Sequence, residues 1–444
     1  MENKYFGTDG VRGIAGDKLT STMAYRIGRY IGQYPHGKKN RILIASDTRV
    51  SGDMLKTALA SGIMASGSDV YLMGVSTTPS ISYLVREKSF DYGIMISASH
   101  NPYYDNGIKI FNARGEKLDG EIEHLIEGYM DSIPDYLPYK INESVGRMVL
   151  SHDLVDDYVD FLAKKAHNLD GLHVIVDGAN GSASVVAPKL FQKLGLTVKY
   201  INVTPNGVNI NDRCGSTHLK QLQTETRKNG FHIGLAFDGD ADRLMVVRPD
   251  GQVVDGDAII YLNALDMKKR GLLKDNKVVI TVMSNIGLKI ALKAADIAVE
   301  EVQVGDKYVQ ACLKEHHLSL GGEQSGHIIF LDDLNTGDGL LTAIKVMNVM
   351  KESGQTLTEL LSGLKIYPQI LKNVSVVNKD AVMAHKGLKE LIDELSKTLN
   401  GNGRILVRAS GTEPLVRVMA EAPTLEECER VVSSLVNYIG EISY

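Results

Sequence analysis

The chain has 444 residues, which is too long for one hydrophobic core and, at roughly 150 residues per domain, predicts about three domains. Hydrophobic residues make up 43% and charged residues 23%, a balance that is typical of globular proteins and excludes extensive disorder. The net charge is −5 with no block of like charges, which argues against nucleic acid or an anionic membrane surface as a partner.

The first segment, MENKYFGTDGVRG (1–13), lacks the apolar stretch of a signal peptide, and no run in the chain approaches the ~18 apolar residues of a membrane span. The three cysteines are far apart and show no CxxC or Cys/His spacing, so neither a disulfide framework nor a zinc site is expected. We therefore expect a cytoplasmic protein. Within this segment, Arg12 is a site candidate only if the N-terminus folds back onto a cleft.

Three short apolar runs predict buried strands: RILIASDTR (41–49), HVIVDGANGS (173–182) and KVVITVMSN (277–285). Each is rich in β-branched or aliphatic residues, ends in small polar residues and is followed by a helix candidate. Strands that alternate with helices in this way are typical of βαβ units with parallel strands. The predicted fold class is α/β, with three βαβ-type mixed-sheet domains.

A second apolar run follows each unit and opens into a polar loop: SASHNP (97–102), FDGDADR (237–243) and GGEQSGH (321–327). The recurrence indicates a weak internal triplication, visible in the pattern but not in residue identity. Loops at the carboxyl ends of parallel strands are where open α/β sheets bind ligands. We therefore expect the three loops to face one cleft.

The pattern changes after Tyr367. A helical period (382–399), a strand, turn and strand (403–422) and a closing helix (424–439) predict a separate small α+β domain of about eighty residues.

The loop after residue 96, ISASHNPYYDNGIK (96–109), raises the question of whether Ser99 is a turn residue or a nucleophile. Asn-Pro and Asp-Asn-Gly are both turn signals, a Ser-His dipeptide is not a catalytic triad, and no GxSxG motif is present. Taken alone, the stretch is better explained as a turn. Beside a metal-bound phosphate site, however, a serine can carry a phosphoryl group, and Lys109 becomes an acid/base candidate if burial or a neighbouring cation lowers its pKa.

In the second loop, Asp238, Asp240 and Asp242 occupy every second position, so in an extended segment their side chains point the same way. The alternative is a solvated acidic turn, but apolar runs flank the loop on both sides. The EF-hand pattern fails, because Arg243 and Pro249 stand where its glycine and glutamate should be. Three clustered carboxylates favour a hard cation, Mg²⁺ or Ca²⁺. With only three carboxylate ligands, Mg²⁺ that also binds a phosphate oxygen is the better fit.

The turn of the final domain carries hydroxyl groups, small residues and arginines, the chemistry of a phosphate cradle; its candidates are Arg408, Ser410, Gly411, Thr412 and Arg417. A hairpin turn with solvated charges is an equal alternative when this segment is taken alone. No Walker A or GxGxxG sequence occurs, so nucleotide binding is not supported.

The third loop offers Glu323, Ser325 and His327, groups that can bind sugar hydroxyls or an amine. Taken alone it is nonspecific, since a lone histidine is more often structural. Lys307, in GDKY (305–308), has only a weak claim to face the sugar and is not among the candidates.

The combination is more informative than its parts. FGTDGVRG, SASHNPYYDNGIK, DGDADR, GEQSGH and RASGTEP occur in that order along the whole chain, which closely resembles the α-D-phosphohexomutase superfamily. More narrowly, KYFGTDGVRG and GEQSGH resemble the bacterial phosphoglucosamine mutases, which interconvert glucosamine 6-phosphate and glucosamine 1-phosphate for UDP-N-acetylglucosamine and cell-wall precursor synthesis.

The resemblance implies four domains around a central cleft: a phosphoserine domain (1–150), a metal-binding domain (151–252), a sugar-recognition domain (253–366) and a C-terminal phosphate-binding domain (367–444). It also implies an enzyme that is phosphorylated on Ser99. One Mg²⁺ per chain would be held by the three aspartates and a phosphoserine oxygen.

By the same resemblance, Arg12, His100 and Lys109 act at the reacting phosphate, with Lys109 as general acid/base and Arg243 helping to place it. Glucosamine 1,6-bisphosphate is the implied intermediate and activator. The glutamate, serine and histidine of the third loop would hold the sugar, and the cradle of the final domain would hold the non-reacting phosphate.

Three alternatives stay open. A phosphomannomutase/phosphoglucomutase would share this chemistry and differ at C2 of the sugar, a non-catalytic sugar-phosphate-binding protein would keep the fold without turnover, and a phosphohydrolase would release inorganic phosphate. The expected partner is a small sugar phosphate. Whether a kinase or a bisphosphate first phosphorylates Ser99, and whether the chain forms a homodimer, are also open.

Overall fold

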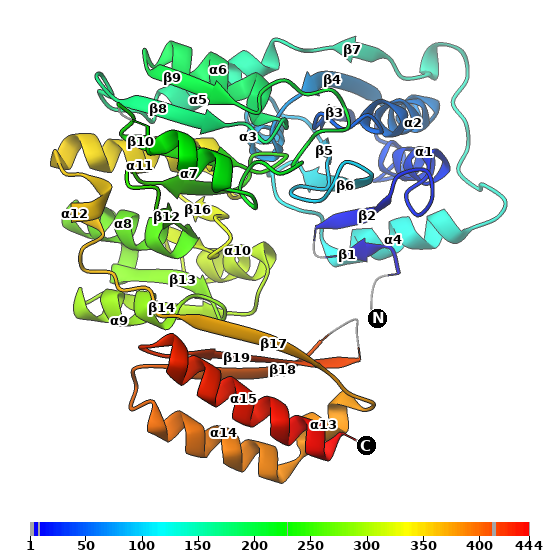
Figure 1. Cartoon of the computed structure of the whole chain (residues 1–444). Coiled ribbons are helices and arrows are strands. Elements are labelled where there is room, and N and C mark those ends of the chain that lie inside the picture. The colour runs from blue at the N-terminus through cyan, green and yellow to red at the C-terminus, as the bar shows by residue number, and fades with distance from the viewer. Residues whose placement is uncertain (1–3, 8, 229, 411–413, 444) are drawn as a thin grey trace. The chain divides into compact units, whose positions relative to one another are not determined.

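The structure is a computed structural model that describes residues 4–7, 9–228, 230–410 and 414–443. The chain divides into two compact units: the first comprises Met1–Val282 and Ala298–Leu361, and the second comprises Met283–Ile297 and Ser362–Tyr444. Three of the four sheets lie in the first unit and one in the second (Figure 1). The architecture is α/β with mixed sheets and a small C-terminal domain, as the sequence predicts.

The first sheet has seven strands in the order β1 (Phe6–Gly7), β2 (Gly10–Ile14), β6 (Asp105–Asn112), β5 (Tyr92–Ile96), β3 (Arg41–Ser46), β4 (Asp69–Val75) and β7 (Met148–Leu150). Its helices are α1 (Ser21–Ile31), α2 (Gly52–Ala65), α3 (Thr78–Glu87) and α4 (Gly120–Asp131). The strands β3, β4, β5 and β7 are parallel, whereas β6 and β2 add to the sheet antiparallel.

The second sheet runs β12 (Val253–Val254), β11 (Leu244–Val247), β10 (Ile233–Phe237), β8 (His173–Asp177) and β9 (Thr197–Ile201), with helices α5 (Leu154–Ala163), α6 (Ala183–Lys193) and α7 (Lys220–Thr226). The third runs β14 (Ala298–Val302), β13 (Lys277–Thr281), β15 (Leu320–Gly322) and β16 (Ile328–Phe330), with helices α8 (Gly256–Lys269), α10 (Asp306–Glu315), α11 (Gly339–Ser353) and α12 (Leu357–Leu360). Short 3₁₀ turns lie at Asn142–Ser144 and Lys274–Asn276.

The three sheets share one connection, which explains the repeated pattern in the sequence. In each, the last parallel strand turns back into an antiparallel neighbour: β5 into β6, β10 into β11 and β15 into β16. The polar loops are the turns of these hairpins, starting after Ile96, Phe237 and Gly322. The expectation that they follow the carboxyl ends of parallel strands is confirmed.

Burial accounts for the composition of the strands that lead into the loops. Every residue of β5 (YGIMI) and β10 (IGLAF) is buried, as expected for strands covered on both faces, which read as continuous apolar runs. Helix α3 begins with Thr77, whose side chain accepts a hydrogen bond from the N–H of Ser80, and with Pro79 in its first turn. Rigid elements therefore lead into the first two polar loops.

The second unit contains α9 (Ile286–Ala294), β17 (Gln369–Ser375), α13 (Lys379–Ala384), α14 (Lys386–Thr398), β18 (Arg404–Ala409), β19 (Leu415–Glu421) and α15 (Leu425–Ile442). Strands β18 and β19 and helix α15 confirm the predicted strand, turn, strand and closing helix. The predicted single helix over 382–399 is wrong in detail: the helical region breaks at His385 into α13 and α14. Strand β17, which pairs with β19, was not predicted.

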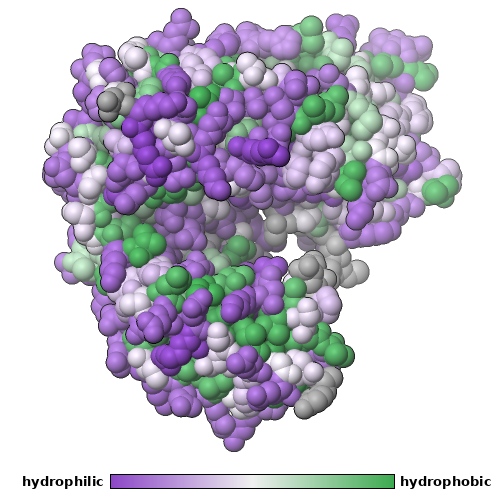
Figure 2. Space-filling view, viewed as in Figure 1, coloured by the Kyte–Doolittle hydropathy of each residue, from purple (hydrophilic) through white to green (hydrophobic). Residues whose placement is uncertain are grey.

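The face of the molecule seen in Figure 2 is mostly hydrophilic, with hydrophobic residues scattered among polar ones. Among the helices of the described residues, none combines the length and the apolar character that crossing a membrane requires.

Two glycines let helices α1 and α2 approach closely against the first sheet. A Cβ at Gly62 would lie 2.1 Å from the carbonyl oxygen of Tyr25, and one at Gly28 would lie 2.3 Å from that of Leu59. We expect Gly62→Ala to lower the free energy of unfolding of the first unit by about 1–3 kcal/mol, because the helices must separate. The measurement is the denaturation midpoint.

Gly128→Ala is the matched control, since a Cβ at that position in α4 meets nothing within 4 Å among the described residues. It should leave stability unchanged or raise it by up to about 1 kcal/mol through helix propensity. Equal midpoints for the two variants would show that the close helix contact contributes nothing.

Candidate active site

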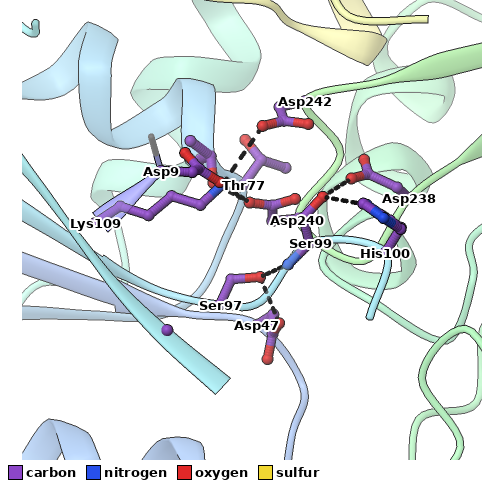
Figure 3. A network of polar contacts seen from close by, with 12 residues as sticks. Asp9, Asp47, Thr77, Ser97, Ser99, His100, Lys109, Asp238, Asp240 and Asp242 are labelled. Carbon is purple, nitrogen blue, oxygen red and sulfur yellow. Dashed lines mark hydrogen bonds and ion pairs between the residues drawn. The ribbon is translucent and has the colours of Figure 1, made fainter. Parts of the chain in front are cut away.

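Ser99 lies in the hairpin turn between β5 and β6 and is only 1% exposed. Its backbone is left-handed, with φ at 53°. Its Oγ donates a hydrogen bond to Oδ2 of Asp238 at 2.5 Å (Figure 3). Nδ1 of His100 lies 3.4 Å from the Oγ of Ser99. The first polar loop therefore meets the second.

The three aspartates of the second loop form a cluster in which one oxygen from each lies within 4.8 Å of the others. All three are buried. Burial and the charges of Asp242 and Asp240 hold the pKa of Asp238 well above its usual range, which is the signature of crowded like charges. A cation bound among them would relieve this repulsion.

Two oxygen atoms in this cluster, Oδ1 of Asp240 and Oδ1 of Asp242, are buried and have no hydrogen-bond partner among the described residues. Buried polar atoms are rarely left without a partner, and a cation would provide one for both. The donor set is all oxygen, as hard cations prefer. The residues present thus fit a metal ion, and the cluster can hold one.

The backbone of the aspartate loop is tied to the first sheet by α3. The N–H of Thr78 donates to the carbonyl oxygen of Asp240 at 3.0 Å, and its Oγ1 donates to Asp240 Oδ2 at 2.5 Å. On the other side, a Cβ at Gly239 would lie 2.4 Å from the carbonyl oxygen of Ser99, so only glycine allows the two loops to pack so closely. The serine and aspartate loops are in direct contact.

Lys109, on β6, is buried among carboxylates. Its Nζ lies 2.7 Å from Asp240 Oδ2, 2.9 Å from Asp9 Oδ2 and 3.5 Å from Asp242 Oδ2. Burial opposes the charge, but these carboxylates outweigh it and raise the pKa of Lys109 above its usual range. The lowered pKa that the sequence-based role required is therefore not found, and the lysine is an ammonium ion in this site.

His100 and Arg243 flank the serine and aspartate loops. Burial, together with the positive charges of Arg243 and Arg12, lowers the pKa of His100 to about 4, so its ring is neutral at pH 7. The main-chain N–H of Arg243 donates to Asp238 Oδ1 at 3.1 Å, and its Nε lies 3.9 Å from Asp242 Oδ1. These contacts join Arg243 to the aspartates rather than to the lysine that it was expected to place.

A cavity of about 300 Å³ opens beside this cluster and is lined from all three sheets of the first unit. Its lining includes Arg12, Asp242, Arg243, Glu323 and His327. Arg12 on β2 reaches it, so the N-terminal segment does fold back onto a cleft. The guanidinium of Arg12 pairs with the carboxylate three residues before it.

Two of the three candidates from the third loop line the cavity. Oε1 of Glu323 accepts a hydrogen bond from the N–H of Gly305 at 3.0 Å. Nε2 of His327 accepts one from the N–H of Gly337 at 3.1 Å, and its Nδ1 lies 3.6 Å from Oδ1 of the third aspartate. Ser325 is exposed and does not belong to the described lining of the cavity.

The phosphate-cradle candidates lie in the second unit. Arg408 and Arg417 are paired directly across β18 and β19, and Ser410 is buried, with its N–H donating to the carbonyl oxygen of Leu415 at 2.9 Å. The strand pairing places the two arginines directly opposite each other, so their side chains share one face of the sheet. The remaining candidates, Gly411 and Thr412, fall outside the described residues.

Three charged residues around the cavity were not identified from the sequence. Asp9 accepts from Lys109 and from Lys117, each at 2.9 Å, and Lys117 also pairs with Asp306 at 2.6 Å. Asp9 stands in FGTDGVRG and Asp306 in GDKY, close in sequence to the basic residues Arg12 and Lys307 of the same two motifs. Lys117 belongs to none of the motifs described above, and only the folded chain brings it to this network.

Comparison with known proteins agrees with this arrangement. Four family models match: phosphoglucomutase/phosphomannomutase alpha/beta/alpha domains I (residues 3–137), II (156–251) and III (255–367), and the C-terminal domain (371–437). Two curated relatives named phosphoglucosamine mutase are similar over the full length. The one from Exiguobacterium is 45% identical (99% of this chain, 98% of that one), and the one from Lachnospira eligens is 46% identical (99% of both).

Solved structures share the fold at lower identity. A phosphoglucomutase/phosphomannomutase family protein from Burkholderia thailandensis has a TM-score of 0.81 at 24% identity (100% of this chain, 99% of that one). An N-acetylphosphoglucosamine mutase from Aspergillus fumigatus, solved with GlcNAc-6P and magnesium, has a TM-score of 0.71 at 20% identity (100% and 96%). From the four matched domains and the full-length relatives, we conclude that the chain belongs to the phosphoglucomutase/phosphomannomutase family.

Proposed function

We propose that this protein is a phosphoglucosamine mutase, an isomerase that interconverts glucosamine 6-phosphate and glucosamine 1-phosphate. The observation that carries the proposal is the 2.5 Å hydrogen bond from Ser99 Oγ to Asp238, within a cluster of carboxylates that can hold a metal ion. A hydroxyl so placed is suited to carry a phosphoryl group. The choice of amino sugar rests on the names of the relatives that are 45–46% identical.

In the proposed reaction, phosphoserine 99 donates its phosphoryl group to the free hydroxyl of the sugar phosphate. The bond between phosphorus and Oγ breaks, a bond from phosphorus to the sugar oxygen forms, and the hydroxyl proton replaces the phosphoryl group on Oγ. The product of this half-reaction is glucosamine 1,6-bisphosphate. Return of its other phosphate to Ser99 gives the isomer and restores the enzyme.

The residues around Ser99 would supply positioning and charge, which dominate phosphoryl transfer. Arg12, Arg243 and the ammonium of Lys109 would offset the charge of the transferring group. Its raised pKa keeps Lys109 as an ammonium ion, which favours this charge-stabilising role over proton transfer, because efficient acid/base catalysis requires a pKa near the working pH. The neutral ring of His100 would bind the group by a hydrogen bond.

Mg²⁺ is the metal that we propose for Asp238, Asp240 and Asp242, where it would neutralise charge on the phosphoryl oxygens. Glu323, Ser325 and His327 would bind the sugar, although the exposure of Ser325 makes it the weakest of the three. The non-reacting phosphate would be held by the cradle of the final domain, which consists of Arg408, Ser410, Gly411, Thr412 and Arg417. The proposal therefore includes the four domain roles that the resemblance implies: phosphoserine, metal-binding, sugar-recognition and phosphate-binding domains.

The test is a comparison of kcat/KM on glucosamine 6-phosphate, glucose 1-phosphate and mannose 1-phosphate. We expect a preference of about tenfold or more for the amino sugar, the range over which one differing group is discriminated. A preference for either hexose phosphate would instead favour a phosphomannomutase/phosphoglucomutase. Release of inorganic phosphate as the main product would identify a phosphohydrolase, and no turnover would favour a binding protein.

A kinase or bisphosphate that starts the cycle, a homodimer and a cytoplasmic location remain expectations from the sequence.

A further inference from the structure

Arg49, in the loop after β3, contacts the Ser99 turn at several points although it does not belong to the described lining of the cavity. Its side chain is fully buried. The guanidinium donates to the main-chain oxygens of Ser99 and Asn101, each at 2.9 Å, to that of Asp105 at 3.0 Å and to that of Pro102. One side chain thus binds four carbonyl groups of a single turn.

Asp47 fixes Arg49 and supports the turn from a second direction. Its Oδ2 accepts from Nε of Arg49 at 2.8 Å and from Oγ of Ser97 at 2.6 Å. Ser97 Oγ in turn accepts from the N–H of Ser99 at 2.9 Å, as the chain of contacts in Figure 3 shows. Both polar groups of the Ser99 backbone, N–H and C=O, are therefore held through the Asp47–Arg49 pair.

The second sheet contributes a third support. Nδ2 of Asn211 donates to the carbonyl oxygen of Ser99 at 2.9 Å and to that of Asn101 at 3.0 Å. These are two of the four oxygens that Arg49 also binds. The carbonyl of Ser99 is consequently held by donors from two different segments.

This arrangement matters because the left-handed backbone of Ser99, with φ at 53°, is unfavourable for a residue that has a side chain. Such conformations persist where surrounding contacts over-determine them, and they cluster at functional sites. If the turn relaxed, Oγ would leave its position beside Asp238. Asp47 and Arg49 restrain the Ser99 turn as a pair of opposite charges, so they add no net charge next to a phosphorylated serine.

We propose that Arg49, fixed by Asp47 and assisted by Asn211, is a positioning residue that holds Ser99 in the geometry required for phosphoryl transfer. The inference rests on the proposed role of Ser99 as phosphoryl carrier. Arg49 acts through the turn and not on the sugar. Its loss should therefore reduce the rate of transfer and leave sugar binding intact.

The experiment is Arg49→Lys in the full-length protein. A lysine keeps the positive charge but lacks the planar guanidinium group whose N–H donors bind the four carbonyl oxygens. We expect kcat to fall about tenfold to a hundredfold, the cost of misplacing a reacting group by about 1 Å, with KM within about twofold of wild type. Single-turnover transfer from phosphorylated Ser99 to glucosamine 6-phosphate, followed by intact mass, should slow equally.

Arg29→Lys is the matched control. Arg29 is also fully buried in the first unit and binds main-chain oxygens, those of Ala65, Leu137 and Pro138, but it does not contact the Ser99 turn. It should lower the melting temperature and leave kcat unchanged. If Arg29→Lys reduces kcat as much as Arg49→Lys does, or if Arg49→Lys raises KM alone or changes nothing, the inference is wrong.

Asn211→Gly provides a second variant in case Arg49→Lys does not fold. Asn211 has φ at 58°, which glycine adopts freely, so the change removes the amide without straining the backbone. A several-fold loss of kcat at constant KM is expected, and an unchanged kcat contradicts the inference. A wild-type protein that neither carries phosphate on Ser99 nor turns over would defeat the proposed function itself.

Discussion

Ser99→Ala should abolish mutase turnover, lowering kcat by about 10,000-fold or more, the scale of loss seen when a covalent nucleophile is removed. The serine hydroxyl is the only group in the proposed cycle that carries the phosphoryl group between the two ends of the sugar. The change also removes the donor to Asp238 but leaves the backbone contacts of the turn in place. Intact mass should show phosphate on the wild-type protein and none on the variant.

Ser82→Ala is the control for this substitution. Ser82 is another buried serine of the first unit, on α3, and its Oγ donates to the carbonyl oxygen of Gly115 at 2.6 Å. The variant should keep its phosphate and its activity while losing a little stability. Retention of turnover by Ser99→Ala would refute the phosphoserine mechanism outright.

Removal of the metal is expected to have the second largest effect. Dialysis against a chelator should abolish turnover, and added Mg²⁺ should restore it. Asp240→Asn should reduce kcat by about a thousandfold, because charge stabilisation by a metal is worth several kcal/mol, and should weaken Mg²⁺ binding measured by calorimetry. The same change removes the negative charge that lies 2.7 Å from Nζ of Lys109.

Asp333→Asn is the matched control for the aspartate. Asp333 also accepts from two cations, Lys165 and Lys345, each at 2.8 Å, but it is not part of the aspartate cluster. We expect wild-type activity and Mg²⁺ affinity from this variant. Full activity after exhaustive chelation, or an Asp240→Asn variant no worse than Asp333→Asn, would exclude a catalytic metal at this site.

The sequence predicts the parts of this fold that depend on short-range pattern. Continuous apolar runs identify buried strands such as β3, β8 and β13, and the residues that end them identify the loops. Strand β17 was missed because its sequence, QILKNVS, mixes polar and apolar residues and is mostly exposed. Its pairing with β19 is a tertiary effect that no local pattern encodes.

Within the site, the sequence predicts which groups are reactive better than it predicts their surroundings. Alternating aspartates predict a cluster of carboxylates that can hold a cation, because their spacing is a local property. The ionisation of Lys109 is different, since it depends on burial and on two carboxylates far away in the sequence, Asp240 and Asp9. Arg49 was not identified for the same reason: it stands in a predicted strand-loop unit, and its four carbonyl partners follow about fifty residues later.

The ties between the serine and aspartate loops bear on how a bisphosphate could present each of its ends in turn. Thr78 and Asn211 each make two hydrogen bonds between the parts of the chain that carry the first and second sheets, so four bonds join the regions of the serine loop and the aspartate loop. Separating them between half-reactions would break all four bonds. In the proposed cycle, the bisphosphate would therefore turn in the cleft while the serine and aspartate loops stay together from one half-reaction to the next.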